Sequence, residues 1–146
     1  MRVIRYLAPL LALAASAGEA APERYVAGQV WEYRTRPADE GSLLKIQAVE
    51  PSAAGTAGEP IYHISVIGMR LAAPDVVGTL QHAPVSREAL DQSVTRLSTR
   101  TAVFPDAQEG IAHWRKANGG VFTVPVATIA EIMDKQTSEF SRAKRE

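Results

Sequence analysis

Cysteine is absent from this chain of 146 residues. The absence excludes disulfides, thiol catalysis and cysteine metal ligands, and it also excludes a lipid-modified N-terminal cysteine. A domain without disulfides must be held together by its hydrophobic core. We therefore expect a core-stabilised protein with no stable membrane anchor.

The chain also has no net charge, because 16 basic residues balance 16 acidic ones. Residues 1–17 contain Arg2 and Arg5 and no acidic residue, so the remainder carries 14 basic and 16 acidic residues, a net charge of −2. A nearly neutral chain has no electrostatic footprint for nucleic acid. No basic amphipathic helix marks a membrane surface either.

Sequence motifs of known chemistry are missing as well. The chain contains no G-x-G-x-x-G, no phosphate loop, no H-E-x-x-H and no G-x-S-x-G elbow. No internal repeat is present. We therefore expect no cofactor and no metal, and the sequence names no catalytic residue.

The first residues of the chain have the pattern of a secretory signal peptide. Arg2 and Arg5 precede an apolar stretch over residues 7–15, and small residues follow, with cleavage expected after Ala17 or Ala20. The stretch is much shorter than the roughly 20 residues of a membrane-spanning helix. We predict a signal peptide over residues 1–20, a single domain over 21–141 and a charged tail over 142–146, in a periplasmic or secreted protein.

Strand patterns occupy the first half of that domain. Polar and apolar residues alternate over 25–36, 42–49 and 61–67, and 79–85 is a possible edge strand. The segment over 51–59 is rich in small residues and is expected to be a mobile loop. Short links between successive strands favour antiparallel pairing.

Helix patterns occupy the second half. Ser86 is a candidate N-cap for a helix whose apolar stripe is Leu90, Val94 and Leu97. A second helix is expected over 107–117, ended by Asn118-Gly119-Gly120, and a third after Pro125. The fold class predicted is α+β: an antiparallel sheet of three to five strands with two or three C-terminal helices packed on one face.

The segment Gly28-Gln29-Val30-Trp31-x-Tyr33-x-Thr35-Arg36-Pro37 resembles the G-Q-[VI]-W-x-Y-x-T-R-P opening of a group of small uncharacterised bacterial proteins. Further similarity lies at 61–65, 82–86 and 120–123, so the resemblance extends from about residue 25 to 133. Many members of that group lack an export signal. The group has no established activity, so the resemblance implies a single domain and no particular chemistry.

Candidate binding residues come from the expected polar face of the sheet and from the loop before the first helix. Alternation places polar side chains of the first three strands on one side, where an arginine fork could hold a carboxylate. His82 precedes a helix N-terminus, a favourable place for an anion. The candidates for contacting a partner or ligand are Arg34, Arg36, Lys45, His63 and His82. If that face is exposed, replacing Arg34 and Arg36 by alanine leaves stability nearly intact.

Two functions of different kinds remain open from the sequence. The first is a non-enzymatic protein-binding module, accessory or inhibitor-like, that meets a protein partner or a small anionic ligand through an open, flat surface. The alternative is a small periplasmic hydrolase with a histidine-centred site. The hydrolase requires a pocket in which His63, Ser65 and a carboxylate lie within hydrogen-bonding distance.

Overall fold

The computed structural model describes residues 23–51, 58–73 and 78–146. The expected signal peptide and most of the expected loop over 51–59 lie outside the described residues. Within those residues no helix has the length and apolar character needed to cross a membrane.

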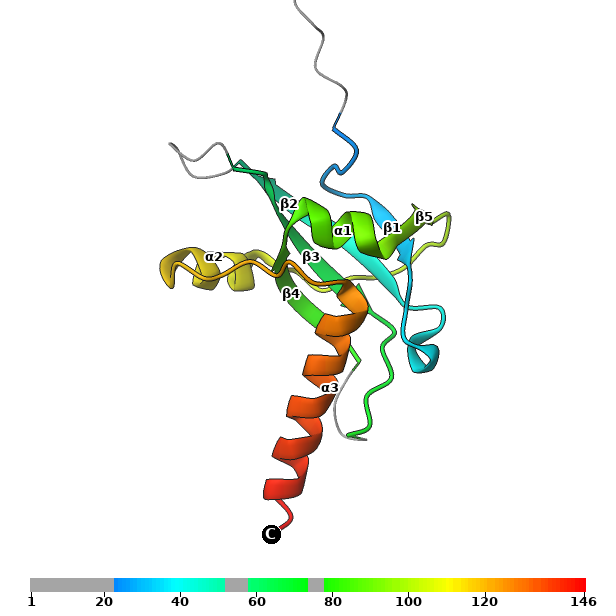
Figure 1. Ribbon diagram of the computed structural model, residues 1–146, viewed down its shortest axis with the longest axis vertical. Helices are drawn as coiled ribbons and strands as arrows, with labels where there is room; N and C mark the ends of the chain where they lie inside the picture. The colour runs from blue at the N-terminus through cyan, green and yellow to red at the C-terminus, as the bar shows by residue number, and fades with distance from the viewer. Residues whose placement is uncertain (1–22, 52–57, 74–77) are drawn as a thin grey trace, which may run out of the picture.

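A five-stranded antiparallel sheet forms the centre of the molecule (Figure 1). Its strands are β1 (Val30–Tyr33), β2 (Leu43–Glu50), β3 (Ile61–Ile67), β4 (Leu80–Val85) and β5 (Val94–Leu97), in the order β4-β3-β2-β1-β5. The helices are α1 (Arg87–Ser93), α2 (Gln108–Lys116) and α3 (Val126–Ala143), with a short 3₁₀ turn over Pro37–Asp39. The predicted α+β class is confirmed.

One face of the sheet carries the hydrophobic core. Trp31 and Tyr33 of β1 lie on it, and alternate residues of β2 and β3 continue it, as the period of two requires. The helices α1 and α3 cover this face, and α1 begins where Ser86 accepts a hydrogen bond from the backbone of Ala89. Buried core residues include Trp31, Tyr33, Leu44, Ile46, Tyr62, Ile64, Leu90, Val126 and Ile129.

The opposite face of the sheet was expected to be open and polar, and here the structure differs. The segment leading into α2 and α2 itself lie against it, so His63 and Ser65 are completely buried. Gln47 donates hydrogen bonds to the Ser65 hydroxyl (3.0 Å) and to the carbonyl of Pro105 (2.9 Å). Helices therefore occupy both faces, because α2 packs on the side away from α1 and α3.

The end of α1 differs from the prediction in a second way. The spacing of Leu90, Val94 and Leu97 suggested one continuous helix, but the helix ends at Ser93 and Val94–Leu97 forms β5. Val94 has an extended backbone, with φ −69° and ψ 147°, and β5 pairs with β1 through Trp31 and Leu97. Pairing with β1 satisfies backbone groups of both strands, which overrides the helical spacing.

A partly buried ion network joins the turn after β1 to α3. Arg36 donates to both carboxylate oxygens of Asp39, at 2.6 and 3.0 Å, and also to Asp134 of α3 at 2.9 Å. Asp39 is fully buried and also accepts from the backbone of Arg70. The Arg36 side chain is thus only 11% exposed and is engaged by two carboxylates, so the expected exposure of Arg36 is not found. Arg34 is exposed and donates to the carbonyl of Gln92.

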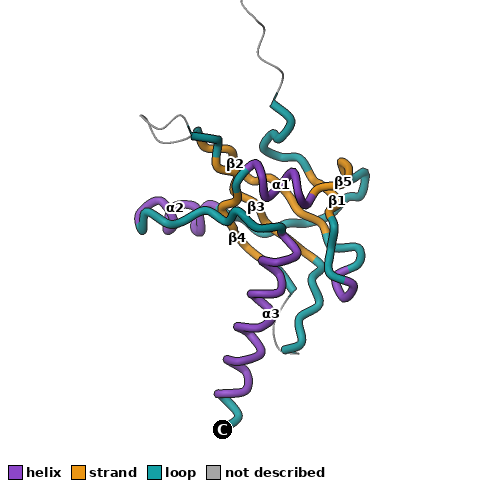
Figure 2. Tube along the Cα trace, viewed as in Figure 1, coloured by secondary structure: helices purple, strands orange, loops and turns teal. Residues whose placement is uncertain are grey.

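The tail predicted over 142–146 begins inside a helix, since α3 continues to Ala143. The first turns of α3 contribute Val126, Ile129 and Ala130 to the core. Its last turns extend away from the sheet (Figure 2), and Phe140 there is 72% exposed.

Replacing Arg36 by alanine should destabilise the fold by about 3–5 kcal/mol, because it leaves the buried carboxylate of Asp39 without its partner. Replacing Arg34 by alanine should change the free energy of unfolding by no more than about 1 kcal/mol. Urea denaturation of the two single variants measures both values. Equal, small effects of the two substitutions would contradict a structural role for Arg36.

Candidate functional site

The five residues proposed from the sequence do not form one surface. Arg34 and Arg36 lie at the end of β1 as described above, and Lys45 of β2 places its ammonium 5.9 Å from the ring of Phe104. His63 and His82, by contrast, are brought into direct contact by the pairing of β3 with β4. The site is therefore built around this histidine pair.

His63 uses both ring nitrogens in hydrogen bonds. Its Nδ1 lies 2.8 Å from Nε2 of His82, and its Nε2 lies 2.5 Å from a carboxylate oxygen of Glu50. The three side chains come from the neighbouring strands β2, β3 and β4, and the register shift in β2 places Ala48 opposite His63 and Glu50 opposite Ile61. We call Glu50, His63 and His82 the histidine cluster.

The positions of the protons follow from these contacts. An ionised Glu50 only accepts hydrogen bonds, so Nε2 of His63 carries a proton. When both rings are neutral, Nδ1 of His63 is then an acceptor and Nε2 of His82 donates to it. When His63 is a cation, its Nδ1 donates and Nε2 of His82 accepts. Either way, the contact between the rings holds a single proton.

Burial, hydrogen bonds and neighbouring charges shift the pKa values of His82 and Glu50. Burial lowers the pKa of His82 below its usual value, and the adjacent His63 lowers it further. Burial by itself would raise the pKa of Glu50, but hydrogen bonds from His63 and Arg115 outweigh that effect and the pKa is lowered. The ionised Glu50 and the neutral His82 are thus the favoured forms in the folded protein.

The helix α2 covers the histidine cluster and contacts each of its members. Trp114 packs edge-on against His63, with ring centroids 4.9 Å apart, and Arg115 donates to Glu50 at 2.6 Å. Gly110 lies so close to His82 that an added Cβ would stand 2.8 Å from the His82 Cβ. Only glycine allows this approach between helix and strand. The end predicted for the helix is confirmed, since Asn118 adopts a positive φ of 49° just beyond it.

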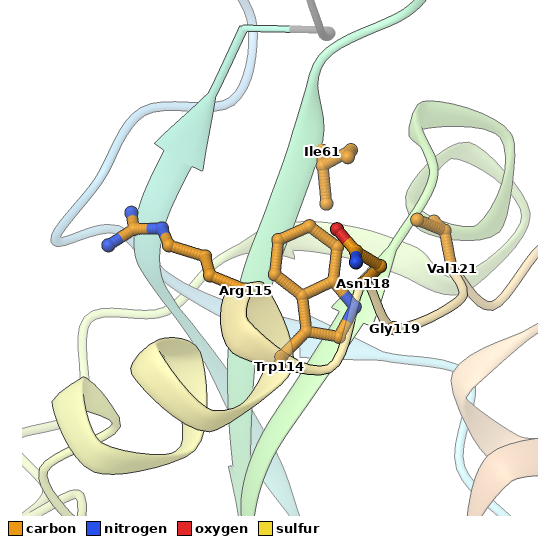
Figure 3. Close-up of a pocket in the computed structure, with 6 residues that line it drawn as sticks. All are labelled: Ile61, Trp114, Arg115, Asn118, Gly119 and Val121. Carbon is orange, nitrogen blue, oxygen red and sulfur yellow. The ribbon is translucent and has the colours of Figure 1, made fainter.

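A groove lies on the outer side of Trp114 (Figure 3). The indole forms one wall, and its Nε1 donates to the carbonyl of Gly120 at 2.8 Å. In Figure 3 the guanidinium of Arg115 points away from the groove, so its aliphatic stem lines the rim. The hollow has a volume of about 310 Å³ and is lined by Ile61, Trp114, Arg115, Asn118, Gly119 and Val121.

A second hollow of about 330 Å³ shares Val121 with the first and is lined by Gly120, Val121 and Phe122. Phe122 is 39% exposed although it is aromatic. Its backbone bridges in parallel to the end of β4, with the Phe122 N–H bonded to Pro84 and its carbonyl to Ser86. We call the two hollows together the Trp114 groove.

Ser65 does not join the histidine cluster. Its hydroxyl donates to the carbonyl of Gln81 at 2.6 Å and accepts from Gln47. His63, Ser65 and a carboxylate thus do not converge as a nucleophilic site requires. Among the described residues, no group of three or more His, Cys, Asp or Glu side chains is arranged to hold a metal ion.

Sequence reasoning identified none of Trp114, Glu50 and Val121 as a site residue. The glycine-rich stop after α2 was a usable signal, because Gly119 lies against Trp114 and leaves no room for a side chain. No pattern in the sequence linked Glu50 to His63, since their contact depends on the register between β2 and β3.

Comparisons of the chain with protein-family models, with curated proteins and with solved structures find no match. The resemblance to small uncharacterised bacterial proteins therefore remains a prediction from the sequence.

Replacing Gly110 by alanine should lower the free energy of unfolding by about 1–2 kcal/mol, because the new methyl group forces α2 away from His82. Replacing glycine by alanine at an exposed helical position normally raises the free energy of unfolding by up to about 1 kcal/mol. A decrease for Gly110→Ala would therefore have the opposite sign to the usual effect. Gly120→Ala is the matched control, because no atom lies within 4 Å of its added Cβ. Thermal or urea unfolding measures the stability of both variants. Equal stabilities of Gly110→Ala and Gly120→Ala would contradict this packing of α2.

Proposed function

We propose that this protein is a non-enzymatic binding module that works outside the cytoplasm and holds an apolar segment of a protein partner in the Trp114 groove. The export pattern of residues 1–20 supports the location. The groove supports the binding role, and it replaces the open sheet face that the sequence favoured.

The observation that carries this proposal is an open hollow, lined by aromatic and aliphatic side chains, beside the end of α2. Aromatic side chains lining a concave surface are typical of the anchoring positions in protein interfaces. A volume of about 310 Å³ is at the lower end of the range for ligand pockets, which suits one or two large side chains. The exposed Phe122 extends the apolar area beside it.

The partner suggested by this lining is apolar rather than anionic. Arg36 is engaged by Asp39 and Asp134, and Arg115 is engaged by Glu50. Asn118 supplies a neutral amide at the rim, which suits a hydrogen bond to a peptide backbone. An extended peptide with one large apolar side chain fits this combination.

The histidine-centred hydrolase has one observation in its favour, the Glu50–His63 hydrogen bond, which is the pairing of a carboxylate with a general base. His63 is fully buried, however, and the nearest hydroxyl considered from the sequence, that of Ser65, is bonded elsewhere. The binding module is therefore the stronger proposal.

The test is a selection of linear peptides from a random displayed library on the full-length mature protein. Peptides with a large apolar residue should be enriched, and Val121→Glu should weaken their binding by about 30-fold or more, equivalent to roughly 2 kcal/mol. The reason is that residue 121 lines both hollows, so the substitution places a charge on an apolar wall of the groove.

Val103→Glu is the matched control, because it makes the same change at a valine that is 91% exposed and outside the groove. Its binding should equal that of the wild type. Circular dichroism confirms that both variants fold. Peptides that bind Val121→Glu as tightly as wild type, or a library that yields no binder, would contradict the proposal.

A further inference from the structure

The hydrogen bond between His63 and His82 depends on how many protons the two rings carry. Two ring nitrogens 2.8 Å apart form a hydrogen bond only when one proton lies between them. One added proton is accommodated, because a cationic His63 donates to Glu50 and to His82 together. A second added proton leaves an N–H on each of the two facing nitrogens, and the hydrogen bond becomes a repulsion between like charges.

Among the residues that the structure describes, one compensating charge faces the two rings. Glu50 of β2 bonds to His63, and it is already shared with Arg115 of α2. On α2 the remaining ionisable side chains, those of Glu109, His113 and Lys116, are exposed. Asp106, in the segment before α2, is also exposed, and its carboxylate accepts from the backbone of Gln108. Two imidazolium rings and a guanidinium would thus face one carboxylate, that of the half-buried Glu50.

The attachment of α2 depends on the same three side chains. Trp114 rests on His63, Arg115 is bonded to Glu50, and Gly110 is pressed against His82. Ile111 adds one buried apolar side chain. Separation of the two rings therefore disturbs most of the surface that holds α2, and Trp114 links that surface to the groove.

We propose that the histidine cluster is an acid-sensitive latch that holds α2, and with it the Trp114 groove, on the sheet. Above the usual histidine range the latch is closed and the groove is intact. In acid the doubly protonated pair separates, α2 is released and the groove loses its wall. The effect on ligand binding rests on the function proposed above, whereas the release of α2 does not.

The sign of the pH effect agrees with the environment of His82. Its pKa in the folded state is lowered, so the neutral ring stabilises the closed form above the usual value near 6.5. That stability is lost as the pH falls through the lowered pKa. Glu50, whose pKa is also lowered, keeps its charge until more acidic conditions.

Hydrogen exchange of the α2 amides at pH 7.5 and pH 5, corrected for intrinsic exchange rates, tests the latch directly. In the wild type, opening of α2 should be about tenfold or more frequent at pH 5, while the β2 and β3 amides stay protected. His82→Gln should abolish the difference, because a glutamine amide can donate to His63 but takes up no proton. Equal protection of wild-type α2 at both pH values would overturn the proposal.

His113→Gln is the matched control, since His113 is the one histidine of α2 and is exposed. It should retain the full pH effect, and loss of the effect in this variant would overturn the assignment to the cluster. A second measurement needs no variant: the ring protonation of His82, followed by NMR in the wild type, should share its midpoint with the loss of α2 protection. Separate midpoints would overturn the latch.

Peptide binding at the two pH values distinguishes the proposed binding function from the proposed latch. A peptide whose binding is weakened by Val121→Glu should bind about tenfold or more weakly at pH 5, and this loss should disappear in His82→Gln. Binding unchanged at pH 5 would leave the binding function standing and overturn acid control of the groove. If no such peptide exists, the binding function fails while the exchange experiment still decides the latch.

Discussion

A buried imidazole with both nitrogens satisfied is the constraint on which this side of the molecule depends. His63 is fully buried on the sheet face that α2 covers, so each of its ring nitrogens needs a partner. Glu50 and His82 supply them from the two adjacent strands. The arrangement holds only if β2, β3 and β4 keep their register and α2 excludes water.

The two faces of the sheet are stabilised by different physics. The face under α1 and α3 is an aromatic and aliphatic core, while the face under α2 holds two separate hydrogen-bonded groups, Gln47 with Ser65 and the histidine cluster. Apolar burial is non-directional and tolerates a change of pH. A polar network depends on the protonation of its members, and here it lies directly beneath the helix that walls the Trp114 groove.

Most of the fold could be predicted from the sequence, but little of the candidate site could. The bounds of β3, the Ser86 cap and the helix stop at Asn118 follow from local alternation and turn chemistry, which short segments determine by themselves. The β5 strand was missed because the spacing of Leu90, Val94 and Leu97 is also helical. The burial of His63 depends on α2, and the bond from Arg36 to Asp134 spans 98 residues, so alternation within a strand reveals neither.

The protonation states of His63 and His82 test the central claim most directly, by long-range ¹H–¹⁵N NMR of the imidazole rings at about pH 8. The account predicts that His63 is protonated at Nε2, facing Glu50, and that His82 is also protonated at Nε2, with its Nδ1 bare. Each ring should keep its proton on Nε2 and should not exchange between tautomers. Rings that exchange between tautomers, or a His63 protonated at Nδ1 alone, would contradict a hydrogen-bonded Glu50–His63–His82 cluster.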